Sequence, residues 1–337
     1  MSGSRADIES AGGHTDMKSK KRKPNTAGRM RTGRKNSRDL MLMSLPAIIW
    51  YILFCYLPFF GIFFAFKNFT PKPGDSLFRN LFINSRWSGM DNFSFLFRSS
   101  EMPRILFNTL FYNGIFLMLG IVIPVFLAIF LAEIHSRFFS GFVQMVMILP
   151  YFLSWVIVGY CLYGFLATDE GQLNHVLRMF GASAVQWYQS PQYWRVILIL
   201  THIWKVTGYS MIIYLCAITS IDRTLYEGAR IDGASFLQRV RYITLPMLRP
   251  TIATIFILQT GSILASDFGL FYQVPRNQGM LYPVTDTIDT YVFRSLLKNG
   301  NIGLSSAAAF YQSVVCFITI MIFNGIMNKV SKEDALF

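Results

Sequence analysis

Six long apolar windows constrain this chain more than any other feature, because each is long enough for a helix that crosses a membrane, which takes about 20 residues. They cover residues 40–66, 105–132, 139–166, 193–218, 251–271 and 304–327. None alternates polar and apolar residues as a barrel strand does. Only 15% of the residues are charged, against about 25% in soluble domains. The sequence therefore excludes a soluble enzyme and predicts an all-α membrane protein with six transmembrane helices.

The basic N-terminal segment predicts the orientation of the chain. Residues 1–38 hold 11 of the 31 Lys and Arg residues but only three acids, so we expect a disordered cytoplasmic tail there and a membrane domain over residues 39–337. An even number of spans puts both termini on one side, and the basic tail favours the cytoplasm. We expect the basic tail to be attracted to anionic membrane lipid, and we expect no nucleic acid partner. Met17 would also serve as a start, so residues 1–16 are expected to be dispensable.

The sequence contains no recognisable catalytic or metal-binding motif. The four cysteines lie in the apolar windows without CxxC spacing or a companion histidine, so we expect no disulfide and no metal site. There is no HExxH motif and no G-x-x-x-x-G-K-[ST] phosphate-binding loop. We therefore expect no catalytic residue, no cofactor and no ATP hydrolysis by this chain.

The segment between the fourth and fifth windows, about residues 219–250, has the most specific pattern in the chain. Its order is E-x-A-x3-G-x9-I-x-L-P, and its members are Glu227, Gly228, Ala229, Asp232, Gly233, Ala234, Ile243, Leu245 and Pro246. Residues 225–231 and 236–243 are expected to form two short helices, joined at a glycine that permits the turn. Pro246 is expected to end the second helix before the fifth span begins.

This pattern resembles the EAA loop of type I ABC importer permeases. The segments LPYFLSWVIVG (149–159), ITLPMLRPTI (243–252) and TDTIDTYVFR (285–294) are similar to the carbohydrate branch of that family, in particular to permeases for complex oligosaccharides from polysaccharide breakdown, which are related to the maltose permeases. Gly228 stands where the family usually has Ala. The resemblance implies a six-helix permease core over residues 39–337, with both termini cytoplasmic and the nine loop residues coupled to an ATPase.

The same resemblance implies the partners. Such a permease pairs with a second homologous permease, binds two ATP-binding subunits through the EAA loops, and receives an oligosaccharide from an extracellular or periplasmic solute-binding protein. Its location would be the cell membrane, as a multi-pass protein. The alternatives are a permease for a peptide, an amino acid or phosphate, and, in another class, a membrane sensor. The sequence leaves open which sugar is carried, how long its chain is, and whether uronates are accepted.

Polar residues inside the windows are the candidates for a substrate pathway, because charged groups in hydrocarbon cost about 2.5 to 3.5 kcal/mol on insertion scales and should face a cavity or a partner. Lys205 lies near the middle of the fourth window and Gln259 within the fifth, so both are expected to meet one ligand. The full predicted pathway is His202, Trp204, Lys205, Tyr209, Gln259 and Ser262. The alternative is structural: Lys205 binds backbone carbonyls or a carboxylate of the partner permease, and Gln259 joins two helices.

Overall fold

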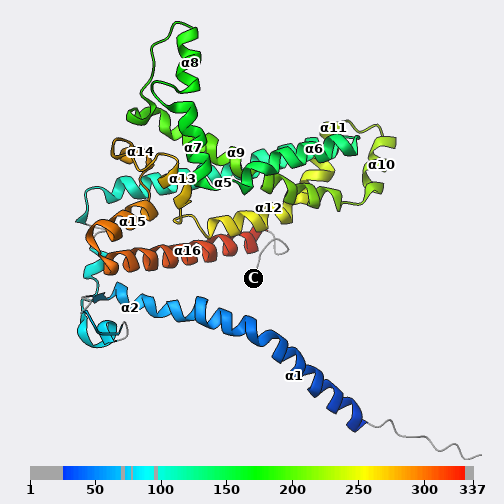
Figure 1. The fold of residues 1–337 in the computed structure, drawn as a ribbon. Helices are drawn as coiled ribbons and strands as arrows, with labels where there is room; N and C mark the ends of the chain where they lie inside the picture. The colour runs from blue at the N-terminus through cyan, green and yellow to red at the C-terminus, as the bar shows by residue number, and fades with distance from the viewer. Residues whose placement is uncertain (1–25, 70–72, 77–78, 95–97, 331–337) are drawn as a thin grey trace, which may run out of the picture. The chain divides into compact units, whose positions relative to one another are not determined.

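The computed structural model describes residues 26–69, 73–76, 79–94 and 98–330 (Figure 1). The chain divides into two units, of which the first ends at Phe60 and the second begins at Gly61. The first unit contains α1 (Thr26–Tyr51), followed by the π-helical turn η1 (Ile52–Tyr56) and the start of the 3-10 turn η2 (Leu57–Gly61). Residues 1–25 of the predicted disordered tail lie outside the described residues. Helix α1 begins inside that predicted tail, since extending a formed helix costs far less than nucleating one. The division at residue 38 stays a prediction.

The second unit is a helical assembly with one two-stranded ribbon, β1 (Lys67–Asn68) paired antiparallel with β2 (Arg86–Trp87). Its first half contains α2 (Ile62–Ala65), η3 (Asn80–Asn84), η4 (Asp91–Phe93), α5 (Met102–Ala132), α6 (Arg137–Ile148), η5 (Leu149–Phe152), α7 (Trp155–Leu166), α8 (Gln172–Met179) and η6 (Trp187–Gln189). Its second half contains α9 (Pro191–Thr219), α10 (Arg223–Ile231), α11 (Phe236–Arg239), η7 (Val240–Thr244), α12 (Leu245–Thr260), α13 (Phe268–Gln273), η8 (Gly279–Leu281), α14 (Tyr282–Thr285), α15 (Ile288–Asn299) and α16 (Ile302–Val330).

Among the described residues, five helical segments are long and apolar enough to cross a membrane, and a bent pair makes a sixth if it counts as one span. The five are 39–65, 102–132, 191–219, 236–260 and 302–329, and the bent pair joins 137–152 to 155–166. These segments correspond to the six predicted windows, and the all-α membrane fold is confirmed.

The third window was predicted as one transmembrane helix, but it forms two helices that meet at 99°. Pro150 lies in the 3-10 turn η5, and the backbone becomes extended at Leu153. The hydroxyl of Ser154 then accepts a hydrogen bond from the N–H of Ile157 and starts α7. The break is therefore encoded by a proline and by a capping serine that follows it.

The fifth window is also interrupted. Helix α12 ends at Thr260, a loop follows, and α13 begins at Phe268. The side chain of Asp267 accepts hydrogen bonds from the backbone N–H groups of Gly269 and Leu270, which caps α13. Its other carboxylate oxygen accepts a hydrogen bond from the indole N–H of Trp155 at 2.8 Å. One carboxylate thus joins the break in the fifth window to the break in the third.

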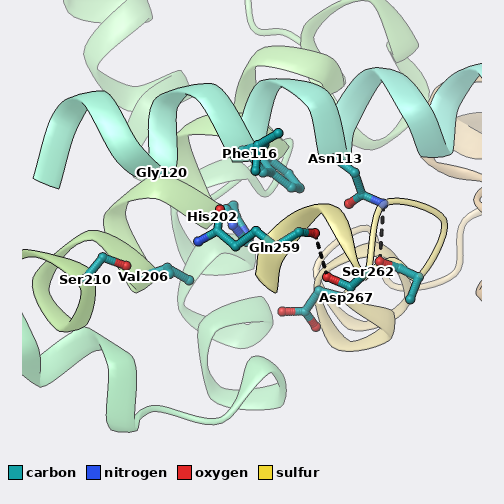
Figure 2. A pocket seen from close by; sticks show the side chains of 11 residues that line it. Asn113, Phe116, Gly120, His202, Val206, Ser210, Gln259, Ser262 and Asp267 are labelled. Atoms are coloured by element: carbon teal, nitrogen blue, oxygen red, sulfur yellow. Dashed lines mark hydrogen bonds between the residues drawn. The ribbon is translucent and has the colours of Figure 1, made fainter. Parts of the chain in front are cut away.

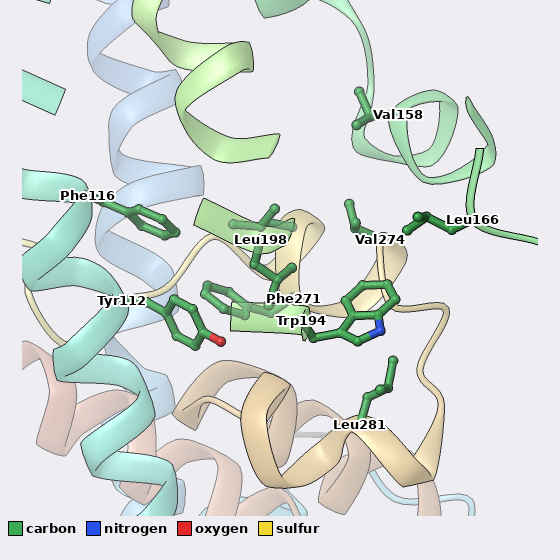
Figure 3. Packing of buried hydrophobic residues seen from close by; sticks show 10 residues of the cluster. Tyr112, Phe116, Val158, Leu166, Trp194, Leu198, Phe271, Val274 and Leu281 are labelled. Carbon is green, nitrogen blue, oxygen red and sulfur yellow. The ribbon is translucent and has the colours of Figure 1, made fainter. Parts of the chain in front are cut away.

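Helices α5 and α9 form the centre of the second unit. At one end, Tyr112 and Phe116 of α5 pack with Trp194 and Leu198 of α9 and with Phe271 of α13 (Figure 3). Further along the same two helices, a second cluster joins Ala128 and Leu131 of α5 to Met211 and Tyr214 of α9 and to Leu248 of α12. Helix α12 therefore packs against both central helices, α5 and α9.

Candidate functional site

The loop predicted to resemble an EAA loop forms two short helices joined by a glycine turn. The side chain of Asp222 accepts a hydrogen bond from the N–H of Thr224 and caps α10; this bond holds the pKa of the carboxyl below its ordinary value. After α10, Gly233 has φ +76°, and Ser235 and Gln238 form a capping box on α11. The prediction of two helices that meet at Gly233 is confirmed.

The prediction that Pro246 ends the second helix was wrong. Residues 236–260 form one continuous helical segment, with a π-helical turn, η7, between α11 and α12. In this turn the N–H of Leu245 donates to the carbonyl of Val240, five residues earlier. A wider turn leaves room for a proline at the start of α12, where its missing N–H is tolerated. Ile243, Leu245 and Pro246 therefore lie on the helix that continues into the bundle.

The loop presents apolar side chains that no described residue covers. Ile231 at the end of α10 is 87% exposed, Leu237 on α11 is 74% exposed, and Tyr242 is 70% exposed. Glu227, Gly228, Asp232 and Gly233 are exposed as well, whereas Ala229 and Ala234 are partly buried. Exposed apolar groups beside charged ones are typical of a surface that a partner covers. The sequence analysis missed Ile231, Leu237 and Tyr242, since a single exposed apolar residue has no distinctive spacing.

An acidic residue at the end of α5 anchors the loop. The carboxylate of Glu133 lies 3.3 Å from a guanidinium nitrogen of Arg239 and 3.9 Å from one of Arg230. Arg239 also donates to the carbonyl oxygen of Ala234 at 3.1 Å, just after the glycine turn. The sequence analysis missed Glu133; the only signal was a lone acid just after the second window, on the side where the loop arginines lie. This contact ties α10 and α11 to α5.

A cavity of about 250 Å³, with apolar and polar side chains in its lining, lies between α5, α9 and the end of α12 (Figure 2). It is lined by Asn113, Phe116, Leu117, Gly120, His202, Val206, Ser210, Gln259, Ser262, Ala265 and Asp267. The imidazole of His202 stacks on the ring of Phe116 with centroids 3.7 Å apart, and its Nδ1 is buried without a partner among the described residues. The amide of Asn113 donates to the carbonyls of Ile263 and Ala265 and holds the loop after α12. The cavity therefore offers polar groups from three helices.

Three of the six predicted pathway residues, His202, Gln259 and Ser262, lie together at this cavity. Trp204 is exposed on α9, and Tyr209 is exposed too, stacked on the ring of Tyr151 with centroids 4.5 Å apart. Their role in a substrate pathway stays a prediction.

Lys205 is near the middle of α9 and buried, as its place in the sequence indicated, but it does not line the cavity. Its ammonium donates to the carbonyl oxygen of Tyr151 at 2.7 Å and lies 5.1 Å from the ring centroid of Trp155. Lys205 and Gln259 therefore do not line one cavity, and the alternative given from the sequence, a bond from Lys205 to a backbone carbonyl, is the contact that the structure shows. The bend in the third window supplies the reason, because a broken helix leaves carbonyls that a buried ammonium can bind.

No group of three or more His, Cys, Asp or Glu side chains that could hold a metal ion occurs in the described part of the chain. The four cysteines are free. The described residues thus contain an exposed loop, formed by α10 and α11, and a cavity that one continuous helix connects to that loop.

Comparisons with known proteins agree with this arrangement. Residues 120–332 match the family described as "Binding-protein-dependent transport system inner membrane component". The chain is 34% identical over 294 residues to the polygalacturonan/rhamnogalacturonan transport system permease protein YteP of Bacillus subtilis, covering 87% of this chain and 89% of that protein. It is 31% identical over 299 residues to the protein LplB of the same organism, covering 89% of this chain and 91% of that protein.

A solved structure is similar over almost its whole length. It is a chain of a bacterial alginate ABC transporter, crystallised in complex with an alginate pentasaccharide-bound periplasmic protein. The TM-score is 0.79 and the identity 32%, over 90% of this chain and 99% of that chain. The resemblance drawn from the spacing in residues 219–250 is confirmed: this chain belongs to the binding-protein-dependent transport system inner membrane components, a family of transport permeases.

Proposed function

We propose that this chain is a permease subunit of an ATP-binding-cassette importer and that it translocates an oligosaccharide across the cell membrane. The observation that carries the proposal is the exposed loop of α10 and α11, which continues as one helix to a cavity that holds amide, hydroxyl and imidazole groups. Further support comes from similar proteins, whose names describe the transport of polygalacturonan or rhamnogalacturonan and of alginate. The ATPase would be a separate subunit, in keeping with the absence of a phosphate-binding loop from the sequence.

The complex would contain a second homologous permease, two ATP-binding subunits and an extracellular or periplasmic solute-binding protein. Both termini and the α10–α11 loop would face the cytoplasm, in line with the basic residues before the first window. The loop would then dock on an ATP-binding subunit through Ile231 and Leu237, with Glu227 and Asp232 at the rim of the contact.

Because the helix is continuous, a movement of the docked loop would also move the walls of the cavity. A displacement of α11 is passed to α12, since η7 joins them without a break. Gln259, one residue before the end of α12, lines the cavity. Glu133 passes the same displacement to α5, which forms another wall of that cavity. Closure of the ATP-binding subunits would thereby alter the walls that surround the substrate and shift the permease between its open states.

The cavity suits sugar hydroxyls. Gln259, Ser262 and Asn113 provide amide and hydroxyl groups that can bind them. The test of the proposed function is growth and uptake in a strain lacking this gene, measured with a panel of oligosaccharides. Loss of uptake of one oligosaccharide class, restored by the gene, is expected. Loss of peptide, amino acid or phosphate uptake instead would contradict the proposal.

We expect Gln259→Leu and Lys205→Met to affect different properties. Gln259 faces the cavity, so its loss should raise the KM for transport about tenfold, the cost of one or two hydrogen bonds, without lowering the melting temperature. Lys205 binds the carbonyl of Tyr151, so its loss should lower stability by about 1 kcal/mol and leave KM unchanged. Uptake kinetics and thermal melting of both purified variants check this. A raised KM for Lys205→Met at unchanged melting temperature would return Lys205 to the substrate pathway.

Glu133→Gln is expected to weaken coupling without unfolding the protein. The change removes the charge that holds Arg239 and Arg230, and a partly exposed ion pair contributes about 1 kcal/mol or less. Substrate-stimulated ATP hydrolysis by the reconstituted complex should therefore fall severalfold. Glu101→Gln is the matched control, since Glu101 pairs with Arg104 at the start of α5, at the opposite end of that helix from Glu133. Equal hydrolysis by the two variants would show that the anchor does not contribute.

A further inference from the structure

A second hollow, of about 390 Å³, lies apart from the cavity between α5, α9 and α12. It is formed by α7, by α13 and by the turn that follows α13. The residues that matter here are Tyr160 on α7, Tyr272 and Gln273 on α13, and Arg276 and Asn277 in the turn. In the orientation proposed above, this end of the bundle is the outer one, opposite the α10–α11 loop. A substrate handed over from outside would reach this hollow before the central cavity.

Arg276 supplies a positive charge that has no acidic partner among the described residues. Its side chain instead lies against aromatic rings: the guanidinium carbon is 4.2 Å from the ring centroid of Tyr163 and 5.7 Å from that of Tyr160. Stacking on rings leaves the planar edge of a guanidinium free, and this edge matches a carboxylate in a bidentate manner. The side chain is exposed, so the edge can be reached from solvent.

The backbone that presents Arg276 is held in an uncommon conformation. Arg276 and Asn277 have φ +55° and +51°, and they are the non-glycine residues with positive φ in the described part of the chain. The turn is closed by hydrogen bonds from their N–H groups to the carbonyls of Gln273 and Tyr272, both at 3.1 Å. The hydroxyl of Tyr282 donates to the side-chain oxygen of Asn277 at 3.0 Å. Such strain is retained where the surrounding structure requires one geometry, and it is frequent at ligand sites.

Helix α7 is held close to this turn. A Cβ atom at Gly159 would lie 2.9 Å from the carbonyl oxygen of Gln273, so only glycine permits the approach that puts Tyr160 and Tyr163 beside Arg276. The arginine and its rings are therefore fixed relative to each other by a close backbone contact as well as by the turn.

We propose that this hollow binds the carboxylate of an acidic sugar residue, a uronate, in the transported oligosaccharide. The guanidinium of Arg276 would bind the carboxylate, the exposed face of Tyr160 or Tyr272 would pack on the sugar ring, and the amide of Gln273 would bind a hydroxyl. A neutral oligosaccharide would leave the guanidinium unmatched. This inference rests on the proposed function and narrows its substrate class to acidic oligosaccharides.

The test compares binding and transport with the complete complex. Binding of trigalacturonate and of the neutral maltotriose is measured by titration calorimetry on the purified complex, and uptake of both is measured in proteoliposomes with the solute-binding protein. Arg276→Gln should weaken trigalacturonate binding about tenfold or more, Arg276→Lys should weaken it less because the charge remains, and the control Arg104→Gln should have no effect. Melting temperatures of all variants confirm that they are folded.

The outcomes separate this inference from the proposed function. Unchanged trigalacturonate binding by Arg276→Gln, or a wild-type complex that binds and transports maltotriose but not trigalacturonate, would overturn the uronate site and leave the importer intact. Weakened binding by Arg276→Gln in a complex that transports no oligosaccharide at all would support the site and overturn the proposed function. Weakened binding together with weakened uptake supports both.

Discussion

Gly233→Val is expected to abolish ATP-driven transport while the protein stays inserted in the membrane. Gly233 has φ +76°, a conformation that is unfavourable for any residue with a Cβ and most unfavourable for a β-branched one. Space is not the reason, because a Cβ at this position would meet no atom within 4 Å. The turn would have to open by backbone rotation, which moves α10 relative to α11 and separates Ile231 from Leu237. Insertion should be unaffected, since the loop lies outside the apolar windows.

The measurement is co-purification of the ATP-binding subunits with the variant, followed by substrate-stimulated ATP hydrolysis in proteoliposomes. Gly228→Ala is the matched control: Gly228 lies on α10, a Cβ there meets nothing within 4 Å, and alanine favours a helix by about 1 kcal/mol over glycine. We expect the control to bind and couple normally. If Gly233→Val also binds ATP-binding subunits and couples normally, the loop is not the coupling element.

Gly208→Ala is expected to destabilise the whole helical unit. Gly208 lies on α9 where the end of α6 crosses it, and an added Cβ would overlap the carbonyl oxygen of Met147 and lie 2.8 Å from the backbone nitrogen of Ile148. Backbone atoms cannot rotate away as a flexible side chain can, so the helices must separate. Overpacking of this kind costs about 1 to 3 kcal/mol, and here it would also disturb the bond between Lys205 and Tyr151.

Thermal melting of the detergent-purified protein, followed by size-exclusion chromatography, measures this loss. Gly141→Ala serves as the comparison, because Gly141 lies on α6 itself and a Cβ there would meet nothing within 4 Å. We expect Gly208→Ala to melt several degrees lower or to be recovered poorly, and Gly141→Ala to melt as the wild type does. Equal melting temperatures would show that α6 and α9 do not pack at this point.

The spans could be predicted because hydrophobicity summed over about 20 residues depends little on local detail. The breaks could not. Pro150 and Ser154 are visible in the sequence, but a proline within an apolar window is also compatible with a helix that merely kinks, so the angle of 99° could not be predicted from these two residues. At Pro246 the error was the opposite one: a helix end was predicted, but the π-helical turn before this proline lets the helix continue.

The same limit applies to the candidate site. The spacing of the loop predicted Gly233 at a turn, because that requirement is local. The partner of Lys205 is a carbonyl far away in the sequence, at the bend. The depth of Lys205 and a carbonyl as one alternative acceptor could be predicted, but the identity of that carbonyl could not. Glu133 and Arg276 could not be identified either, because their roles depend on helices that meet only in the folded chain.

ATP-dependent uptake of a labelled oligosaccharide tests the central claim most directly. Proteoliposomes would contain this permease, its second permease and the two ATP-binding subunits, with the solute-binding protein outside and ATP inside. The account predicts accumulation that requires both ATP and the solute-binding protein, and that is lost with Gly233→Val but retained with Gly228→Ala. Accumulation without ATP, or accumulation that Gly233→Val leaves unchanged, would contradict coupling through the α10–α11 loop.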